Sequence, residues 1–116
     1  MKPLRFVGTS KGDLSAFPPA ARLRAGHELF MLQLGREPAD WKPMSSIGAG
    51  ACEIRVRDEA GVFRVVYVAK WADAIYVLHA FQKKARKTAP ADLETAGRRY
   101  REARVLAREV GDGKGE

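Results

Sequence analysis

The sequence lacks several features that define large classes of proteins. It contains a single cysteine, Cys52, among 116 residues, which excludes an internal disulfide and a multi-cysteine zinc site. No apolar run approaches the roughly 18 to 20 residues of a membrane span. The first ten residues, MKPLRFVGTS, contain too short an apolar stretch for a signal peptide. We therefore expect a cytoplasmic protein that does not interact with a membrane.

Common catalytic motifs are also missing. The sequence has no HExxH, no P-loop, no GxGxxG and no pair of carboxylates in a catalytic pattern, so we predict neither a metal site nor a cofactor. His27 lies on the apolar stripe of a predicted helix, and His79 lies within a predicted strand. Both are interpreted as packing residues, and Cys52 fits a small core position better than a nucleophile.

Positive charge is abundant and concentrated in one region. The formal net charge is +7. Nine Lys and Arg residues and three acids lie between Lys83 and Arg108, so this window alone carries +6 and the rest of the chain is nearly neutral. Such a region favours nucleic acid or an acidic protein as partner; the alternative is a soluble surface with a basic bias.

Apolar spacing and turn residues predict an α+β fold. Strands are expected at residues 2–9, 52–57, 62–71 and 74–82. Helices are expected at 10–17 (helix or turn), from the Pro18–Pro19 pair to Gly35, and from Pro90 onward. Residues 36–51 read as a long loop. Short turns make the last three strands antiparallel, so we predict a small, mostly antiparallel sheet of order β-α-α-β-β-β-α with helices packed on it.

This fold is expected to form one domain over residues 1–110, followed by a flexible tail at 111–116, GDGKGE. In the second predicted helix, one apolar stripe is expected to pack on the core. Its members recur at helical spacing: Leu23, His27, Phe30, Met31 and Leu34.

Arg64 is the most informative single residue, because it interrupts an otherwise apolar strand. If residues 58–61 form the turn before it, Arg55 on the preceding strand lies directly opposite Arg64. Like charges in that position are destabilising, unless an anion binds between them or an acid such as Glu53 or Glu59 reaches in. We interpret the pair as an anion site; the alternative is a structural salt bridge in a different register.

A cluster of cations directly follows the last predicted strand: Lys83, Lys84, Arg86 and Lys87. The strand before it is antiparallel, so its start near Arg64 lies beside the end that carries the cluster. The two sets of positive charge are therefore expected to line one basic groove. The alternative is a lysine-rich connection to the last helix.

The sequence from residue 4 to residue 108 resembles the RelE/ParE toxin superfamily, and most closely its phage-derived HigB-like branch. The resemblance rests on five short patterns in a specific order: E-I-R at 53–55, G-V-F-R-V-V-Y at 61–67, L-x-x-F-x-K-K at 78–84, K-T at 87–88 and A-x-x-R-Y at 96–100. It implies a RelE-like fold and the toxin of a type II toxin–antitoxin system.

By this resemblance, the protein is expected to be an mRNA endoribonuclease, or mRNA interferase. It would cut mRNA in the A site of the 70S ribosome and so inhibit translation and growth. The ribose 2′-hydroxyl would attack the adjacent phosphate without a metal ion. The implied partners are mRNA, the ribosome and a cognate antitoxin of the helix-turn-helix type.

The resemblance also implies roles for individual residues. Arg64 would stabilise the phosphorane, Arg55 would hold the scissile phosphate, and Lys84 would act on the phosphate or serve as acid or base. An RNA-binding role is expected for Lys83, Arg86, Lys87, Arg57 and Tyr67. No tyrosine follows the basic cluster closely, so a stacking residue there and the acid and base stay unassigned, with a small role open for His79.

Two alternatives belong to other functional classes. The protein could be a non-catalytic inhibitor of DNA gyrase like the ParE branch, or an inactive phage-derived module that only binds RNA. The facing strand arginines and the Lys83–Lys84 pair favour cleavage over gyrase inhibition. An RNA-binding module would show salt-dependent binding without strand scission.

Overall fold

The computed structural model describes the backbone of residues 1–115 and the side chains of residues 1–110. The strands are β1 (Leu4–Phe6), β2 (Trp41–Pro43), β3 (Ala51–Asp58), β4 (Gly61–Val68) and β5 (Ile75–Lys83). The helices are α1 (Ser10–Ser15), α2 (Pro19–Gln33) and α3 (Pro90–Gly115). The tail predicted at 111–116 lies outside the residues whose side chains are described, and with it the domain boundary at 110 stays a prediction.

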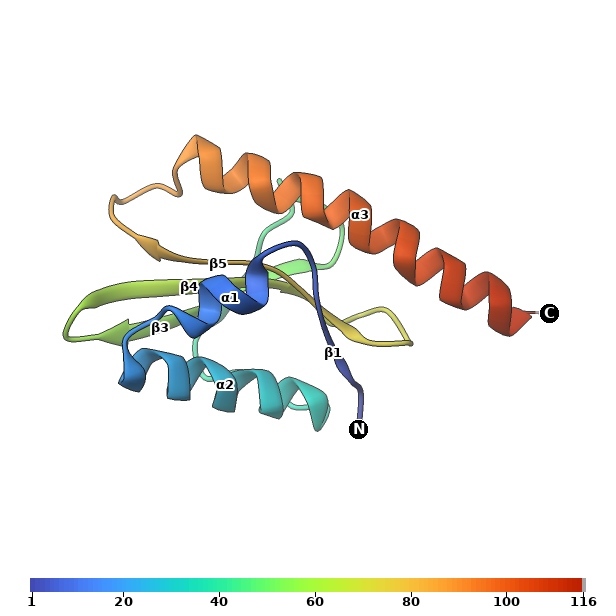
Figure 1. Cartoon of the computed structure of the whole chain (residues 1–116), viewed down its shortest axis with the longest axis horizontal. Helices are drawn as coiled ribbons and strands as arrows, with labels where there is room; N and C mark the ends of the chain where they lie inside the picture. The colour runs from blue at the N-terminus through green and yellow to red at the C-terminus, as the bar shows by residue number, and fades with distance from the viewer. Residues whose placement is uncertain (116) are drawn as a thin grey trace.

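The elements form three layers, which confirms the predicted α+β class (Figure 1). One sheet, of strand order β1-β5-β4-β3-β2, has α3 on one face and α2 on the other, while α1 lies beside β5 near the β1 edge. β1 is parallel to β5 and the other pairs are antiparallel, so the sheet is mixed. The helix starts predicted at Pro19 and Pro90 and the helix end predicted at Gly35 are confirmed.

Two strands differ from the predictions. β2 lies within the expected loop at 36–51, where three residues ending in Pro43 carry no recognisable alternation. Proline is tolerated there because β2 is an edge strand. β1 is shorter than residues 2–9, since the chain turns at Gly8, whose φ is +59°. A Cβ at Gly8 would lie 2.6 Å from Nε of Arg99, so this turn requires glycine.

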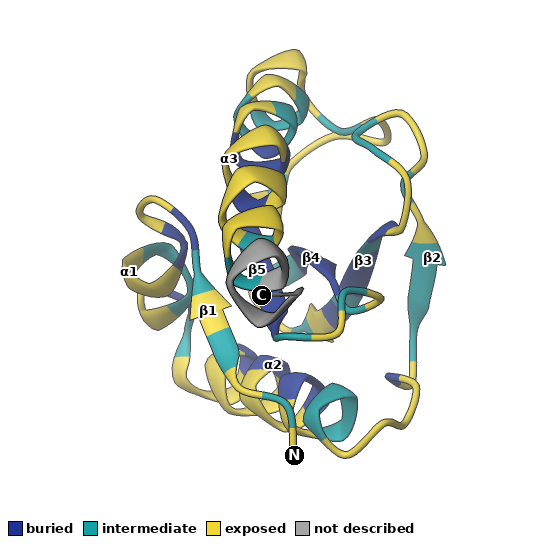
Figure 2. Ribbon diagram, turned by 90° about the vertical axis from the view of Figure 1, so that its right-hand side faces the viewer, coloured by how far each residue is buried: buried dark blue, intermediate teal, exposed yellow. Residues whose placement is uncertain are grey.

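Two hydrophobic cores lie on the two faces of the sheet (Figure 2). Ile54, Val65 and Val77 pack towards α2, whereas Val66 and Leu78 pack towards α3. β4 and β5 are therefore apolar on both faces, as their sequences predict. A one-residue irregularity between β4 and β5 pairs Val66 with His79 and Tyr67 with Val77, which leaves Leu78 without a partner in the ladder.

The orientation predicted for α2 is wrong. Its buried residues include Ala21, Ala25 and Leu29, on the opposite side of the helix from the predicted stripe. Leu23 is 78% exposed, and Phe30, Leu34 and His27 are exposed as well. The interpretation of His27 as a packing residue is therefore also wrong. Small alanines let α2 approach the sheet closely, and the larger side chains face outward.

Candidate functional site

The register between β3 and β4 brings the two strand arginines together. Arg55 pairs with Arg64, as the sequence predicts, and Arg57 pairs with Val62. On the other side of β4, Lys83 pairs with Val62. Directly paired residues project from the same face of a sheet, so all four cations lie on the face that carries α3.

This end of the sheet is open, because α3 does not cover it. Arg57 is exposed, and Arg55, Val62 and Lys83 are partly exposed. Arg64 is the exception and is 6% exposed. The surface thus presents one buried and several accessible cations beside the hairpin of β3 and β4; we call it the basic groove.

Glu53 is the residue that lets Arg55 and Arg64 face each other. Its carboxylate is fully buried and accepts a hydrogen bond from Nη1 of Arg64. The same oxygen lies 3.9 Å from Nε of Arg55. The facing arginines could be tolerated by a bound anion or by an acid that reaches in. The structure contains the acid, Glu53, and Arg55 and Arg64 are in the predicted register. Burial of an ion pair requires such partners, since an isolated buried charge is very costly.

The arginines keep donors that the fold does not use. The buried Nε atoms of Arg55 and Arg64 and Oε2 of Glu53 have no hydrogen-bond partner among the described residues. Lys42 on β2 pairs with Glu53 and adds a further cation to the same face. Lys42, Arg55, Arg57, Arg64 and Lys83 thus lie on the same face as Glu53, whose carboxylate is near Arg64 and Arg55, and positive charge predominates in the basic groove.

The pKa of Lys83 is affected by this concentration of positive charge. Burial and the positive charge of Arg64 lower the pKa of Lys83; Lys42 and Arg55 contribute in the same direction, while Glu53 opposes them. Folded Lys83 therefore loses its proton at lower pH than it does in the unfolded chain. Between these two pKa values the unfolded chain binds more protons, so this residue makes stability rise with pH in that window.

We expect two substitutions to move the pKa of Lys83 in opposite directions. Arg64→Gln removes a repelling cation and should raise it, whereas Glu53→Gln removes an attracting carboxylate and should lower it further. Titration of ¹³C-labelled lysines by NMR measures both shifts, with Lys83→Arg to assign the signal. A pKa that neither substitution changes would show that Lys83 is not in electrostatic contact with the basic groove.

The other predicted cations follow β5 in an exposed loop. Lys84 and Arg86 line a shallow cavity of about 430 Å³ together with Val62, Arg64 and Lys83. A neighbouring cavity is lined by Phe81, Lys83, Lys84, Lys87 and Asp92, among others. The structure thus brings Arg64, Arg55, Lys84, Lys83, Arg57 and Arg86 to one region, with Lys87 at its margin.

Tyr67 is not brought to the basic groove. It is buried in the core on the α2 side, where it pairs with Cys52. Burial raises the pKa of the Tyr67 hydroxyl and also that of the Cys52 thiol. A raised thiol pKa leaves little thiolate, which agrees with the interpretation that Cys52 is not a nucleophile.

Two residues of the basic groove, Glu53 and Lys42, were not predicted as site residues. The alternation of the sequence does, however, indicate where Glu53 projects. Glu53 shares the alternation of Arg55, so it had to project from the same face. Lys42 carried no such signal, because β2 is too short to show a period.

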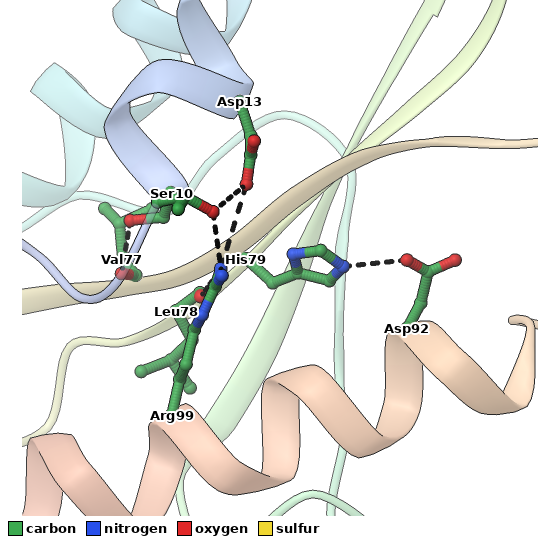
Figure 3. A network of polar contacts seen from close by, with 8 residues as sticks. Ser10, Asp13, Val77, Leu78, His79, Asp92 and Arg99 are labelled. Carbon is green, nitrogen blue, oxygen red and sulfur yellow. Dashed lines mark hydrogen bonds and ion pairs between the residues drawn. The ribbon is translucent and has the colours of Figure 1, made fainter.

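His79 joins the sheet to the start of α3 (Figure 3). It is 8% exposed, and its Nε2 lies 2.8 Å from Oδ1 of Asp92. Its ring stacks on Phe81 with centroids 4.8 Å apart. This contact bridges the base of the cationic loop, since β5 ends at Lys83 and α3 begins at Pro90. His79 is thus buried and stacked, as expected of a packing residue, and its contact with Asp92 links β5 to α3.

Asp92→Ala is expected to destabilise the protein by about 1–3 kcal/mol, because a buried ring nitrogen of His79 loses its partner. Glu94→Ala is the matched control, as Glu94 is an exposed acid two residues further along α3. Urea unfolding of both variants gives the difference. Equal stabilities would show that the His79–Asp92 contact does not hold the loop.

The fold and the basic groove define a small α+β protein with positive charge gathered at one end of its sheet. Residues 12–101 match the family described as Phage derived protein Gp49-like (DUF891). The match covers most of the chain, and the protein belongs to this family. A search of curated proteins finds no match.

The Gp49-like family belongs to the RelE/HigB-like toxin superfamily. It is associated with RelE-like toxins, which are endoribonucleases, and its members are typically paired with an antitoxin. None of the helices that the structure describes is both long enough and apolar enough to cross a membrane.

Proposed function

We propose that the protein is the toxin of a type II toxin–antitoxin pair and acts as an mRNA endoribonuclease. One observation carries this proposal: Arg55 and Arg64 face each other across two strands, anchored by buried Glu53, with Lys83 beside them. This arrangement holds positive charge in a fixed position before any substrate binds. Family membership supports the same reaction class.

The chemistry requires charge stabilisation more than a reactive side chain. The ribose 2′-oxygen attacks the adjacent phosphorus, the P–O5′ bond breaks, and a 2′,3′-cyclic phosphate and a 5′-hydroxyl result. One proton leaves the attacking oxygen and one is delivered to the leaving oxygen. Negative charge builds up on the phosphorane between these steps. Arg64, rigid and nearly buried, would meet that charge without reorganisation, and Arg55 would hold the scissile phosphate.

Two neighbouring lysines are the candidates for proton transfer. Lys83 shares the face of Arg64, opposite Val62, and its pKa is lowered from the ordinary value, which favours proton transfer. We therefore assign proton transfer to Lys83 and contact with the phosphate to Lys84. Arg57, Arg86 and Lys87 would bind the flanking RNA backbone, where exposed cations give affinity that falls with salt.

We further propose that the substrate is mRNA in the ribosomal A site, and that a helix-turn-helix antitoxin controls the activity in the cell. The shallow, open shape of the basic groove suits an RNA strand presented by another body, because the groove does not enclose its ligand.

The test maps new mRNA 5′ ends by primer extension after purified protein is added to a translating extract, with the naked transcript in parallel. New ends on translated message alone are the expected result. Ends on naked RNA too would keep the nuclease and remove the ribosome as an obligatory partner. Growth arrest by the protein without new ends would overturn the nuclease and direct the next assay to DNA gyrase.

A further inference from the structure

α2 is apolar on two opposite sides, although only one of them meets the protein. Ala25 and Leu29 face the sheet. On the far side, Leu23 is 78% exposed, with Phe30 at 44% and Leu34 at 46%. A helix that is apolar all round is normally buried all round. No element that the structure describes covers this outer face.

Gly26 lies on the same outer face and has no explanation within the fold. It sits mid-helix with an ordinary helical backbone, and a Cβ placed there would meet nothing within 4 Å. Glycine at such a position weakens a helix relative to alanine. A residue without a side chain does, however, allow another backbone to approach α2 closely. Gly26 is thus a second, independent feature that suits a docked partner.

The charges at the border of the outer face indicate the chemistry of that partner. Arg22 and Arg24 flank Leu23 and are exposed. Glu28, the only acid of α2, is buried and accepts a hydrogen bond of 2.7 Å from the Ala39 amide. A second copy of the chain would therefore bring further arginines to the interface and no accessible acid of α2. An acidic partner would neutralise them.

We infer that the outer face of α2 is the docking site for an acidic amphipathic helix of another protein. Leu23, Phe30 and Leu34 would bury its apolar side, Gly26 would allow close approach, and Arg22 and Arg24 would pair with flanking carboxylates. α2 and α3 cover opposite faces of the sheet (Figure 2), and the basic groove lies on the face of α3, so the partner would leave the groove accessible. The inference does not depend on RNA cleavage.

The experiment measures binding of a synthetic peptide by fluorescence anisotropy. The peptide is a capped amphipathic helix with leucines on one side and glutamates beside them; a matched peptide carries lysines instead. We expect the glutamate peptide to bind and the lysine peptide to bind at least tenfold more weakly. Leu23→Ser and Phe30→Ser should each weaken binding of the glutamate peptide at least tenfold. Val105→Ser and Leu106→Ser, exposed apolar positions on α3, are the matched controls and should not change it.

Gly26→Gln separates docking from folding, since the two effects have opposite signs. Glutamine is a better helix former than glycine, so the melting temperature of the protein should rise. The added side chain should at the same time weaken peptide binding several-fold. The inference would be overturned if peptide binding did not change with Gly26→Gln, with Leu23→Ser or with the sign of the peptide charge. Dimerisation of the protein that Leu23→Ser abolishes would assign the face to a second copy, and binding to anionic lipid vesicles alone would assign it to a membrane surface.

Discussion

Replacing Arg64 with lysine is expected to lower mRNA cleavage by about a hundredfold or more, while RNA binding changes little. Lysine keeps a positive charge opposite Glu53 but presents a single ammonium group in place of the planar guanidinium. The donors aimed at the developing charge are then lost, whereas the exposed cations that bind the RNA backbone remain. Primer extension on translated message and a filter-binding titration at two salt concentrations measure the two quantities.

Lysine is chosen because the structure makes alanine a poor test. Arg64→Ala would leave the buried carboxylate of Glu53 without its main partner, and inactivity could then reflect unfolding. Arg101→Lys, the same change at an exposed position on α3, is the control and should leave cleavage unchanged. Full activity of folded Arg64→Lys would remove the Arg64 guanidinium from the proposed reaction.

Glu53→Ala should be the most destabilising single substitution in the basic groove, by about 3–5 kcal/mol. It leaves Arg64 buried at 6% exposure with no carboxylate beside it, and Arg55 directly opposite. Glu59→Ala removes an exposed acid from the adjacent hairpin and should change the free energy of unfolding by less than about 0.5 kcal/mol. Urea unfolding of the two variants gives the comparison.

The double variant Glu53→Gln/Arg64→Gln extends the test. Two neutral amides can hydrogen-bond each other and leave no buried charge, so much of the stability should return while cleavage stays absent. If Glu53→Ala proved as stable as Glu59→Ala, the Arg55–Arg64 pair would need an anchor other than Glu53.

The register of β3 and β4 could be predicted because two local rules agree on it. Alternation fixes which residues share a face, and the turn at 58–61 fixes which residues are opposite, so Arg55 had to meet Arg64. The same rule argues against Tyr67 as a groove residue. It lies three positions from Arg64, and an odd separation in a regular strand places two side chains on opposite faces.

Other features depend on contacts that one sequence does not reveal. The orientation of α2 follows from the close approach that Ala21 and Ala25 allow, which competes with the larger side chains on the other side. Lys42 reaches the basic groove only because three residues of a loop join the sheet edge. The contact between His79 and Asp92 requires the position of α3 over β5, which no local pattern sets.

The unpaired Leu78 in β5 determines which of the two lysines shares the face of Arg64. In an uninterrupted strand, residues 78, 80, 82 and 84 would share one face, and Lys84 would project beside Arg64. Because Leu78 is an extra residue, the alternation of faces after it is shifted by one position. Lys83 therefore pairs with Val62 and shares the face of Arg64. A single inserted position thus selects between two adjacent, chemically identical side chains. Deleting Leu78 should leave a regular ladder in which Val77 and His79 keep their partners, Tyr67 and Val66, and Lys83 stays on the face of Arg64.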